Sequence, residues 1–468
     1  MTFKINNICC IGAGYVGGPT MAVIANSCPN IQVNVVDIDP VRIDKWNSKD
    51  LSKLPVFEKG LKEIIKECRG KNLHFSNDIN NHISNADMIF ISVNTPIKST
   101  GFGAGQASDL KWVESSARQI SKYAKGKTIV VEKSTLPVKT ASLIRQILEI
   151  DNTNEQNKEF HVLSNPEFLA EGTAINDLQN PDRVLIGGSD KDAIKALVDI
   201  YSKWVPSAKI LTTDLWSSEL SKLIANAFLA QRISSINSIS ALCELTGADI
   251  KDVSRAIGMD KRIGQFFLNS GPGFGGSCFK KDILNLVYIC NHYGLKEVSQ
   301  YWEKVIEIND WQKKRISKIF VDKLFGTISG KKIAIFGFSF KANTNDTRES
   351  PSISICKDLL EEGARIFIYD PQVSVKQIEV ELNILESDQK ESHYSKDFWS
   401  FANSTYEAAE NADAILILTE WDEFKYLDFE KLSKIMRKPS WIFDTRSIIN
   451  IQDAKSFGIN VWNLGKGN

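Results

Sequence analysis

The sequence lacks the features of several large protein classes. Its 468 residues carry 57 basic and 57 acidic side chains, so the basic excess of nucleic-acid and membrane-surface proteins is missing. No apolar run approaches the roughly 20 residues that span a bilayer. The start of the chain shows no long apolar region of a signal peptide. We therefore expect a cytoplasmic protein without nucleic-acid or membrane partners.

Cysteine and histidine are few and scattered. The eight cysteines form no Cys-x-x-Cys pair, and the histidines form no His-Glu-x-x-His motif or cluster with cysteine. A disulfide framework and a structural zinc site are therefore not expected, and we predict no metal site. Thiols without such a framework are also typical of a reducing compartment.

Length and composition instead favour a large globular protein. The chain is 43% hydrophobic and 24% charged, and its 468 residues predict about two to four domains. Strand and helix patterns alternate near both ends, whereas the middle is mostly helical. We predict the α/β class, with two Rossmann-like doubly wound domains joined by a central helical domain that has a long connecting helix. The predicted domains are residues 1–212, 213–329 and 330–468.

The clearest motif is a dinucleotide fingerprint near the N-terminus. A predicted strand, Ile8–Ile11, leads into Gly12-Ala13-Gly14-Tyr15-Val16-Gly17, then a helix over 19–26 and a strand over 33–36 that ends at Asp37. The glycines let a pyrophosphate approach the helix N-terminus, and the acid accepts hydrogen bonds from a ribose. The pattern predicts a nicotinamide dinucleotide. The alternatives are another nucleotide or a vestigial site.

Asp37 also bears on which dinucleotide binds. Its carboxylate would repel a 2′-phosphate, so the sequence favours NAD over NADP. Arg42 lies one helical turn further along and is a candidate contact for the adenosine end, which softens that preference.

Two further predicted strands end in polar residues. Residues 86–93 form an apolar run that ends at Val93 and continues as Asn94-Thr95, and residues 128–131 continue into Glu132-Lys133-Ser134-Thr135. Ligands of open α/β sheets bind beyond the carboxyl ends of the strands, so a cofactor is expected here. The glycine-rich segment Gly101–Ser108 between them is either a lid or a solvated connection.

Two carboxylates follow the next predicted strand, residues 161–163. Glu167 and Glu171 lie four residues apart and share a face if the segment is helical. They are either cleft residues or ordinary surface acids. The polar segments 151–159 and 379–399 are predicted to be a linker and a surface insertion.

A long helix is predicted from Leu215 to about Thr246. It has helical apolar spacing, no proline and few charges, so much of it is expected to be buried. Lys222 and Asn226 lie at i and i+4 and therefore share one face. This pair is either structural or a means of holding an oxyanion.

The segment Ser270–Asp282 carries four glycines within six residues, followed by Cys278 at the start of a predicted helix. A helix N-terminus favours thiolate over thiol, so a cysteine there can act as a nucleophile. Glycine also lets backbone N–H groups approach a polar ligand. The alternative is a tight turn with a buried cysteine.

The C-terminal third repeats the pattern of the first. Predicted strands over 331–337, 365–371 and 411–418 echo three strands of the N-terminal part, but the turn after the first of them lacks the three glycines. We predict a second Rossmann-like domain that binds a different nucleotide-bearing ligand. Lys341 and Arg446 are its candidate anion contacts.

Four motifs together resemble one family. The likeness covers residue 1 to about 465, looks closest to the eukaryotic form, and points to the UDP-glucose 6-dehydrogenases of the UDP-glucose/GDP-mannose dehydrogenase family. One departure is Gly271-Pro272 in the glycine loop. The other is a chain end without the long tail of some members, so regulation through such a tail is not expected. The motifs are Gly12-Ala13-Gly14-Tyr15-Val16-Gly17, Ser164–Gly172, Gly273–Asp282 and Asp346-Thr347-Arg348-Glu349-Ser350.

This resemblance implies oxidation of the C6 alcohol of UDP-glucose to the carboxylate of UDP-glucuronate, in two NAD-linked hydride transfers without release of the aldehyde. Cys278 would form a thiohemiacetal and then a thioester that water hydrolyses. Lys222 and Asn226 would steady oxyanions, and Asp282 would position or activate water. The other implied catalytic residues are Glu167, an acid or base that acts through water, and Thr135 close by.

The resemblance also implies binding residues and an assembly. The position of Arg262 serves a neighbouring subunit's site in this family, so a homo-oligomer is implied, either a dimer or a hexamer built from dimers. The expected cofactor contacts are Gly12, Gly14, Tyr15, Val16, Gly17, Asp37, Arg42, Val93, Asn94, Thr95, Ser134, Thr135, Glu171, Lys281 and Arg348. The expected substrate contacts are Glu167, Phe168, Leu169, Lys222, Asn226, Arg262, Phe274, Gly275, Phe340, Lys341 and Arg446.

Two alternatives remain open. Another nucleotide-sugar 6-dehydrogenase, acting on GDP-mannose or a UDP-N-acetylhexosamine, would run the same reaction with other base and sugar contacts. A catalytically dead nucleotide-sugar-binding scaffold would keep the fold, but it would have no need for Cys278, Lys222 and Asp282 together.

Overall fold

Two largely parallel sheets form the cores of this protein. The computed structural model describes residues 3–135, 137, 139–150, 158–383 and 398–467. The chain forms two compact units. The N-terminal unit is Met1–Ala225 with Leu284–His292, and the C-terminal unit is Asn226–Ile283 with Tyr293–Asn468.

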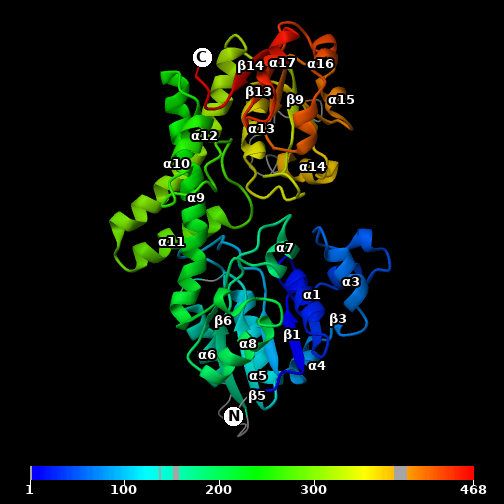
Figure 1. Ribbon diagram of the computed structural model, residues 1–468, viewed down its shortest axis with the longest axis vertical. Helices are drawn as coiled ribbons and strands as arrows, with labels where there is room; N and C mark the ends of the chain where they lie inside the picture. The colour runs from blue at the N-terminus through cyan, green and yellow to red at the C-terminus, as the bar shows by residue number, and fades with distance from the viewer. Residues whose placement is uncertain (1–2, 136, 138, 151–157, 384–397, 468) are drawn as a thin grey trace. The chain divides into compact units, whose positions relative to one another are not determined.

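The N-terminal unit contains an eight-stranded sheet (Figure 1). The strand order is β3-β2-β1-β4-β5-β6-β7-β8, and all neighbours are parallel except β6 and β7. The first six strands have the order of a doubly wound dinucleotide fold. Its strands are β1 Asn7–Ile11, β2 Gln32–Val36, β3 Leu73–Ser76, β4 Met88–Ile91, β5 Lys127–Glu132, β6 Glu159–Ser164, β7 Val184–Gly187 and β8 Ile210–Thr213. Its helices before α9 are α1 Gly17–Ser27, α2 Pro40–Asn47, α3 Leu61–Cys68, α4 Ile79–Ser84, α5 Lys111–Tyr123, α6 Thr140–Ile150, α7 Ala174–Gln179 and α8 Lys191–Tyr201.

Strand β1 lies inside a sheet that is packed on both faces, and its apolar residues explain this position. Ile8 and Cys10 belong to one apolar core, whereas Cys9 and Ile11 belong to another. Successive side chains of a strand point to opposite faces, so a strand covered on both faces reads as a continuous apolar run. With both faces packed, the carboxyl ends of the strands are left for ligands.

The middle of the chain is helical. Helix α9, Leu215–Thr246, is a single helix of 32 residues and is drawn in green in Figure 1. The helix predicted from Leu215 to about Thr246 is therefore confirmed. The other helices of this region are α10 Ile250–Gly258, α11 Phe279–His292 and α12 Lys296–Lys323.

The C-terminal unit contains a six-stranded sheet, all of whose neighbouring strands are parallel. Its order, β11-β10-β9-β12-β13-β14, is the order of the first six strands of the other sheet, so the predicted internal repeat is confirmed. Its strands are β9 Lys332–Phe336, β10 Arg365–Tyr369, β11 Trp399–Phe401, β12 Ala414–Ile417, β13 Trp441–Asp444 and β14 Asn460–Asn463. Its helices after α12 are α13 Pro351–Glu361, α14 Val375–Asn383, α15 Thr405–Ala409, α16 Phe429–Ile435 and α17 Ile451–Ser456.

The predicted fold class is confirmed, and the predicted strands differ from the observed bounds by three residues or fewer. The division into residues 1–212, 213–329 and 330–468 stays a prediction. Much of the segments 151–159 and 379–399 lies outside the described residues. None of the helices in the described ranges is long and apolar enough to cross a bilayer.

Candidate active site

The residues predicted to form the site are divided between the two units, and within each unit the structure gives the partners of their side chains. The N-terminal unit holds Gly12, Gly14, Tyr15, Val16, Gly17, Asp37, Arg42, Val93, Asn94, Thr95, Ser134, Thr135, Glu167, Phe168, Leu169, Glu171 and Lys222. The C-terminal unit holds Asn226, Arg262, Phe274, Gly275, Cys278, Lys281, Asp282, Phe340, Lys341, Arg348 and Arg446.

The glycine turn between β1 and α1 has the geometry of a nucleotide cradle. A Cβ atom on Gly12, whose φ is +108°, would lie 2.1 Å from the Ser92 carbonyl oxygen. A Cβ on Gly17 would lie 2.0 Å from the Gly12 carbonyl oxygen. At Gly14 no described atom lies within 4 Å of such a Cβ. Two glycines are therefore required by packing, and Gly14 leaves open space just before α1, which fits a pyrophosphate.

Asp37 is buried at the end of β2 and already holds the turn together. Its Oδ2 accepts the Ala13 N–H at 2.8 Å and lies 3.0 Å from Nη1 of Arg42. Its Oδ1 accepts the Asp39 N–H at 2.9 Å. The carboxylate is only 5% exposed, whereas 42% of the Arg42 side chain is exposed. Asp37 thus fixes the glycine turn in addition to its expected contact with a ribose.

The polar ends of β4 and β5 are tied to each other. The Ser134 hydroxyl donates to the Val93 carbonyl oxygen at 2.8 Å, and the Thr95 hydroxyl donates to the Thr135 carbonyl oxygen at 3.2 Å. Asn94 between them is exposed. The two strand ends predicted to flank a cofactor therefore form one bonded edge of the sheet.

Glu167 belongs to a buried polar cluster that sequence reasoning did not find. Its Oε2 lies 2.9 Å from Nζ of Lys133, and the two side chains are 14% and 3% exposed. Lys133 also donates to Asn165 Oδ1 at 3.0 Å and to Tyr201 Oη at 3.2 Å. The Tyr201 hydroxyl donates to Asn165 Oδ1 at 2.7 Å. A lysine at the end of an apolar strand is the sequence signal that could have revealed this cluster.

The cluster keeps Glu167 charged. Burial alone would raise the pKa of Glu167, but the Lys133 ammonium, the Phe168 N–H and the Lys222 ammonium together outweigh burial and lower that pKa below its ordinary value. The Phe168 N–H also donates to Glu167 Oε1, at 2.8 Å. The pKa of Lys133 is raised, because Glu167 and Tyr201 outweigh its own burial. Glu167 is therefore an ionised carboxylate at neutral pH.

Two cations of the N-terminal unit lie over the ring of Phe168. The Arg183 guanidinium lies 3.8 Å from the centre of its ring, and the Lys222 ammonium lies 5.2 Å from it. The positive charges face the ring, a favourable arrangement that also holds the segment after Glu167 in place. Lys222 is 8% exposed.

Glu132, the last residue of β5, and Glu219 of α9 form a buried carboxyl pair. Burial, followed by the nearby Glu219, raises the pKa of Glu132 well above its ordinary range, and burial raises the pKa of Glu219. Glu219 also accepts the N–H groups of Lys139 and Ala141 at 2.7 and 2.8 Å, at the start of α6. Burial thus favours the protonated form of both groups, and Glu219 ties α9 to the first turn of α6.

Alanine in place of Gly14 is expected to weaken NAD binding at least about tenfold without loss of stability, because the new methyl group enters open space that a pyrophosphate needs. The control is Gly12→Ala, which would collide with the Ser92 carbonyl group and is expected to destabilise the protein by about 2 kcal/mol or more. Calorimetric NAD titration and thermal unfolding of both variants test this contrast. Unchanged NAD affinity of Gly14→Ala would contradict the assignment of the cradle.

In the C-terminal unit, Cys278 immediately precedes α11. Its carbonyl oxygen accepts the Asp282 N–H at 2.8 Å, and its Sγ lies 3.4 Å from the Ser277 hydroxyl. It is the exposed member of eight free cysteines, since the other seven are buried. The predicted placement at a helix N-terminus is confirmed, and the alternative of a buried cysteine is wrong.

Asp282 and Asn226 form a buried pair within the same unit. The Asn226 amide donates to Asp282 Oδ2 at 2.6 Å. The side chains are 1% and 5% exposed. Lys281 Nζ lies 3.8 Å from the other carboxylate oxygen. The carboxylate one turn after Cys278 is therefore held in a fixed orientation by an amide of α9.

The glycines before Cys278 allow close packing. A Cβ on Gly273 would lie 2.7 Å from Asn309 Oδ1, and one on Gly275 would lie 2.6 Å from the Glu349 carbonyl oxygen. Asn309 accepts the Phe274 N–H at 2.8 Å and donates to the Phe274 carbonyl oxygen at 3.2 Å. These contacts hold the loop against α12 and the segment before α13.

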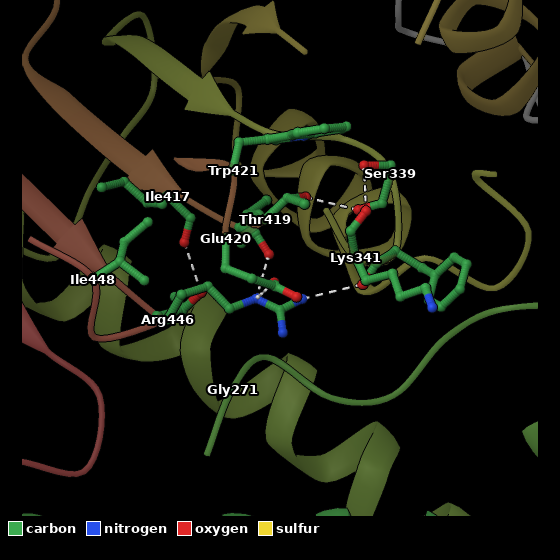
Figure 2. A network of polar contacts seen from close by, with 12 residues as sticks. Gly271, Ser339, Lys341, Ile417, Thr419, Glu420, Trp421, Arg446 and Ile448 are labelled. Atoms are coloured by element: carbon green, nitrogen blue, oxygen red, sulfur yellow. Dashed lines mark hydrogen bonds and ion pairs between the residues drawn. The ribbon is translucent and has the colours of Figure 1, made fainter. Parts of the chain in front are cut away.

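Arg446 lies just beyond the carboxyl end of β13, close to Lys341 and Glu420 in Figure 2. The Arg446 guanidinium donates from Nη2 to the Phe340 carbonyl oxygen at 3.2 Å and from Nε to the Leu418 carbonyl oxygen at 2.8 Å. The Lys341 ammonium lies 5.5 Å from the centre of the Phe340 ring. The two predicted cations therefore flank one turn, as an anion site requires.

Two other predicted arginines have internal partners. Arg348 is bonded through Nε and Nη2 to both carboxylate oxygens of Asp346, at distances of 2.6 to 3.1 Å. Arg262 is bonded to Asp260, and 89% of its side chain is exposed. An exposed Arg262 is compatible with a role outside its own unit.

In the second Rossmann-like domain an acid follows β10, as Asp37 follows β2. Asp370, at the end of β10, accepts the N–H groups of Phe338 and Ser339 at 2.7 and 3.1 Å, and the Trp421 indole N–H at 3.2 Å. The carboxylate is 3% exposed. Asp370 therefore holds the turn after β9, as Asp37 holds the turn after β1.

The three parts of the chain match three domains of one family. Residues 6–205 match the NAD binding domain of the UDP-glucose/GDP-mannose dehydrogenase family, residues 216–311 its central domain, and residues 334–451 its UDP binding domain.

Whole-chain relatives carry the same description. The chain is 55% identical over 470 residues to UDP-glucose 6-dehydrogenase 4 of Arabidopsis thaliana, which covers 98% of this chain and 97% of that protein. It is 54% identical, with the same coverage, to UDP-glucose 6-dehydrogenase 3 of Oryza sativa subsp. japonica. A solved UDP-glucose dehydrogenase from the archaeon Pyrobaculum islandicum superposes with a TM-score of 0.84 at 26% identity, over 100% of this chain and 99% of that chain. The resemblance seen in the motifs is confirmed.

Proposed function

Since this chain belongs to the UDP-glucose/GDP-mannose dehydrogenase family, we propose that it oxidises C6 of UDP-glucose to the carboxylate of UDP-glucuronate with NAD, through a thioester on Cys278. The observation that carries the thioester is the single exposed thiol at the start of α11, with Asp282 held one turn further along. The open space at Gly14 supports the assignment of NAD as the cofactor.

The reaction balances with one thiol and two hydride acceptors. Bound NAD supplies the acceptor for each hydride. After the C6 alcohol has lost a proton and a hydride, Cys278 Sγ adds to the aldehyde carbon and the aldehyde oxygen takes a proton, which gives a thiohemiacetal. Loss of a second hydride and a proton leaves a thioester. Water adds to its carbonyl carbon and the C–S bond breaks, so that Cys278 Sγ regains a proton and the carboxylate leaves with release of a second proton.

Charged and amide groups support these steps. Lys222 and Asn226 would donate to the oxygen that gains negative charge, and Asp282, fixed by Asn226, would orient or deprotonate the water. Glu167 would act through water, with Thr135 nearby. Because the Lys133 ammonium keeps the pKa of Glu167 low, this carboxylate serves at neutral pH as a base or anchor and not as a proton donor.

The remaining assignments complete the proposal. Cofactor contacts are Gly12, Gly14, Tyr15, Val16, Gly17, Asp37, Arg42, Val93, Asn94, Thr95, Ser134, Thr135, Glu171, Lys281 and Arg348. Substrate contacts are Glu167, Phe168, Leu169, Lys222, Asn226, Arg262, Phe274, Gly275, Phe340, Lys341 and Arg446. The domains are residues 1–212, which bind NAD, 213–329, which carry the cysteine loop, and 330–468, which bind the UDP-sugar.

A homo-oligomer, either a dimer or a hexamer built from dimers, and a cytoplasmic location belong to the same proposal. Large apolar side chains exposed along α9 support the oligomer, because such a surface is favourable only when covered. Phe228 and Leu242 are each 55% exposed, and Leu245 is 88% exposed. Eight cysteines without a disulfide support a reducing compartment.

Measuring NADH formation with UDP-glucose, GDP-mannose and UDP-N-acetylhexosamines in turn tests the proposed substrate. UDP-glucose is expected to have the highest kcat/KM, by at least about tenfold, with two NADH formed for each sugar oxidised. A preference for GDP-mannose would contradict the choice of sugar. No turnover with any of them would favour the binding scaffold.

A further inference from the structure

We infer that Glu420 is the positioning residue for the substrate-binding Arg446, and that it acts on UDP binding only through that guanidinium. The inference rests on the proposed function, in which Arg446 contacts the nucleotide sugar. Both residues belong to the C-terminal unit, at the carboxyl ends of β12 and β13. Figure 2 shows the Glu420 side chain beside the guanidinium.

Two carbonyl acceptors and one carboxylate hold one side of Arg446. Its Nε lies 3.1 Å from Glu420 Oε2 and donates to the Leu418 carbonyl oxygen at 2.8 Å, while Nη2 donates to the Phe340 carbonyl oxygen at 3.2 Å. The arginine side chain is 15% exposed and the glutamate 36%. A guanidinium so far withdrawn from water needs a counter-charge, and Glu420 is its acidic partner within ion-pair distance among the described residues.

The contact between the two side chains is an attraction of charge. Although Glu420 Oε2 lies close to Nε, it is buried and has no partner with hydrogen-bond geometry in the part of the chain that is described. The Nε–H is directed instead at the Leu418 carbonyl group. The two carbonyl groups thus set the orientation of the Arg446 guanidinium. The Glu420 carboxylate attracts this group and so limits rotation of the Arg446 side chain.

The arrangement leaves Nη1 for a ligand. Figure 2 shows this nitrogen directed toward Gly271, and a Cβ on Gly271 would lie only 3.2 Å from it. Gly271 is itself fixed, because its N–H donates to Asn237 Oδ1 at 2.8 Å and its carbonyl oxygen accepts from Gln312 at 3.0 Å. No described protein acceptor is bonded to Nη1. A nitrogen with two N–H groups and no protein acceptor suits an anionic oxygen.

The opposite charges of Arg446 and Glu420 give them different roles in UDP binding. A diphosphate oxygen is attracted by Nη1 and repelled by the Glu420 carboxylate, so the carboxylate does not serve as a phosphate contact. Its effect on binding comes from holding the guanidinium plane so that Nη1 is preorganised. Loss of Glu420 is therefore expected to weaken UDP binding only while Arg446 is present.

The test is a double-mutant cycle with UDP as the ligand, measured by isothermal titration calorimetry on the full-length protein. Glu420→Ala and Glu420→Gln both remove the negative charge, so each is expected to raise the Kd of UDP about tenfold. Arg446→Ala is expected to raise it on the order of 100-fold. The double variant should bind UDP as Arg446→Ala does. The matched control is Asp422→Ala, because Asp422 is 81% exposed and pairs with Lys425.

Kinetics and thermal unfolding accompany the titrations. Glu420→Ala is expected to raise the KM of UDP-glucose by the same factor as the Kd of UDP, with kcat and the KM of NAD unchanged. Equal or tighter UDP binding by Glu420→Ala, or additive losses in the double variant, would overturn the inference. Failure of the wild-type protein to oxidise UDP-glucose would instead overturn the proposed function. The UDP titrations measure binding alone, so their result is independent of that oxidation.

Discussion

Replacement of Cys278 by serine is expected to reduce formation of the C6 carboxylate by a factor on the order of 1000 or more. A serine hydroxyl is not ionised at neutral pH, and its ester is hydrolysed less readily than a thioester, so the second oxidation loses its covalent carrier. Binding of UDP-glucose should persist, because the substitution changes one exposed atom. Single-turnover NADH measurements should show at most one NADH for each enzyme-bound sugar.

The control is Cys68→Ser, because Cys68 is a buried thiol at the end of α3 in the N-terminal unit. The turnover of Cys68→Ser should stay close to that of the wild-type protein if the fold of the variant is intact. Near wild-type formation of UDP-glucuronate by Cys278→Ser, with two NADH for each sugar, would show that no covalent step on this residue is needed.

Replacement of Lys133 by methionine is expected to destabilise the protein by about 3–5 kcal/mol, because it leaves the Glu167 carboxylate buried without its counter-charge. Tyr201 and Asn165 stay bonded to each other and do not supply a positive charge. Thermal and urea unfolding of the full-length variant measure the loss. The control is Lys195→Met, because Lys195 pairs with Asp199 on the exposed face of α8 and its loss should cost less than about 1 kcal/mol.

The double variant Lys133→Met with Glu167→Gln separates charge from packing. It should recover much of the lost stability, since a neutral amide needs no ammonium beside it. The pH profile supplies a second test. Folding lowers the pKa of Glu167, so its ionised carboxylate stabilises the folded protein fully above pH 4.5, the ordinary pKa of a glutamate. This stabilisation is lost as the pH falls through the pKa of the folded state. An equal stability of Lys133→Met and the wild-type protein would contradict the charge argument.

Much of the fold follows from patterns that are local in sequence. Ile8 to Ile11 read as a strand because both faces of β1 are covered, and the same holds for Ile333 to Phe336 of β9, which divide between two apolar cores. The strand-turn-helix-strand order around the glycines predicted the turn, since two of those glycines are needed by the backbone itself. The placement of Cys278 before α11 follows from the glycine loop in the same way.

Pairings between distant residues were not predictable in this way. Lys133 and Glu167 are 34 positions apart, and only the adjacency of β5 and β6 brings them into contact. Asn309 fixes the glycine loop from a helix that carries no motif. Glu420 follows an apolar strand that is typical of a buried core. In each case the sheet or helix packing, and not the local sequence, chooses the partner.

The central claim, a thioester on Cys278, is tested most directly by the intact mass of the protein after rapid acid quench of a reaction with UDP-glucose and excess NAD. The account predicts a fraction of the wild-type chain heavier by the mass of UDP-glucuronate less one water, with the added mass located on the peptide that contains Cys278. It also predicts that the fraction rises in Asp282→Asn, where hydrolysis is slowed. A quenched wild-type enzyme and an Asp282→Asn variant that both turn over without ever carrying this mass would contradict the account.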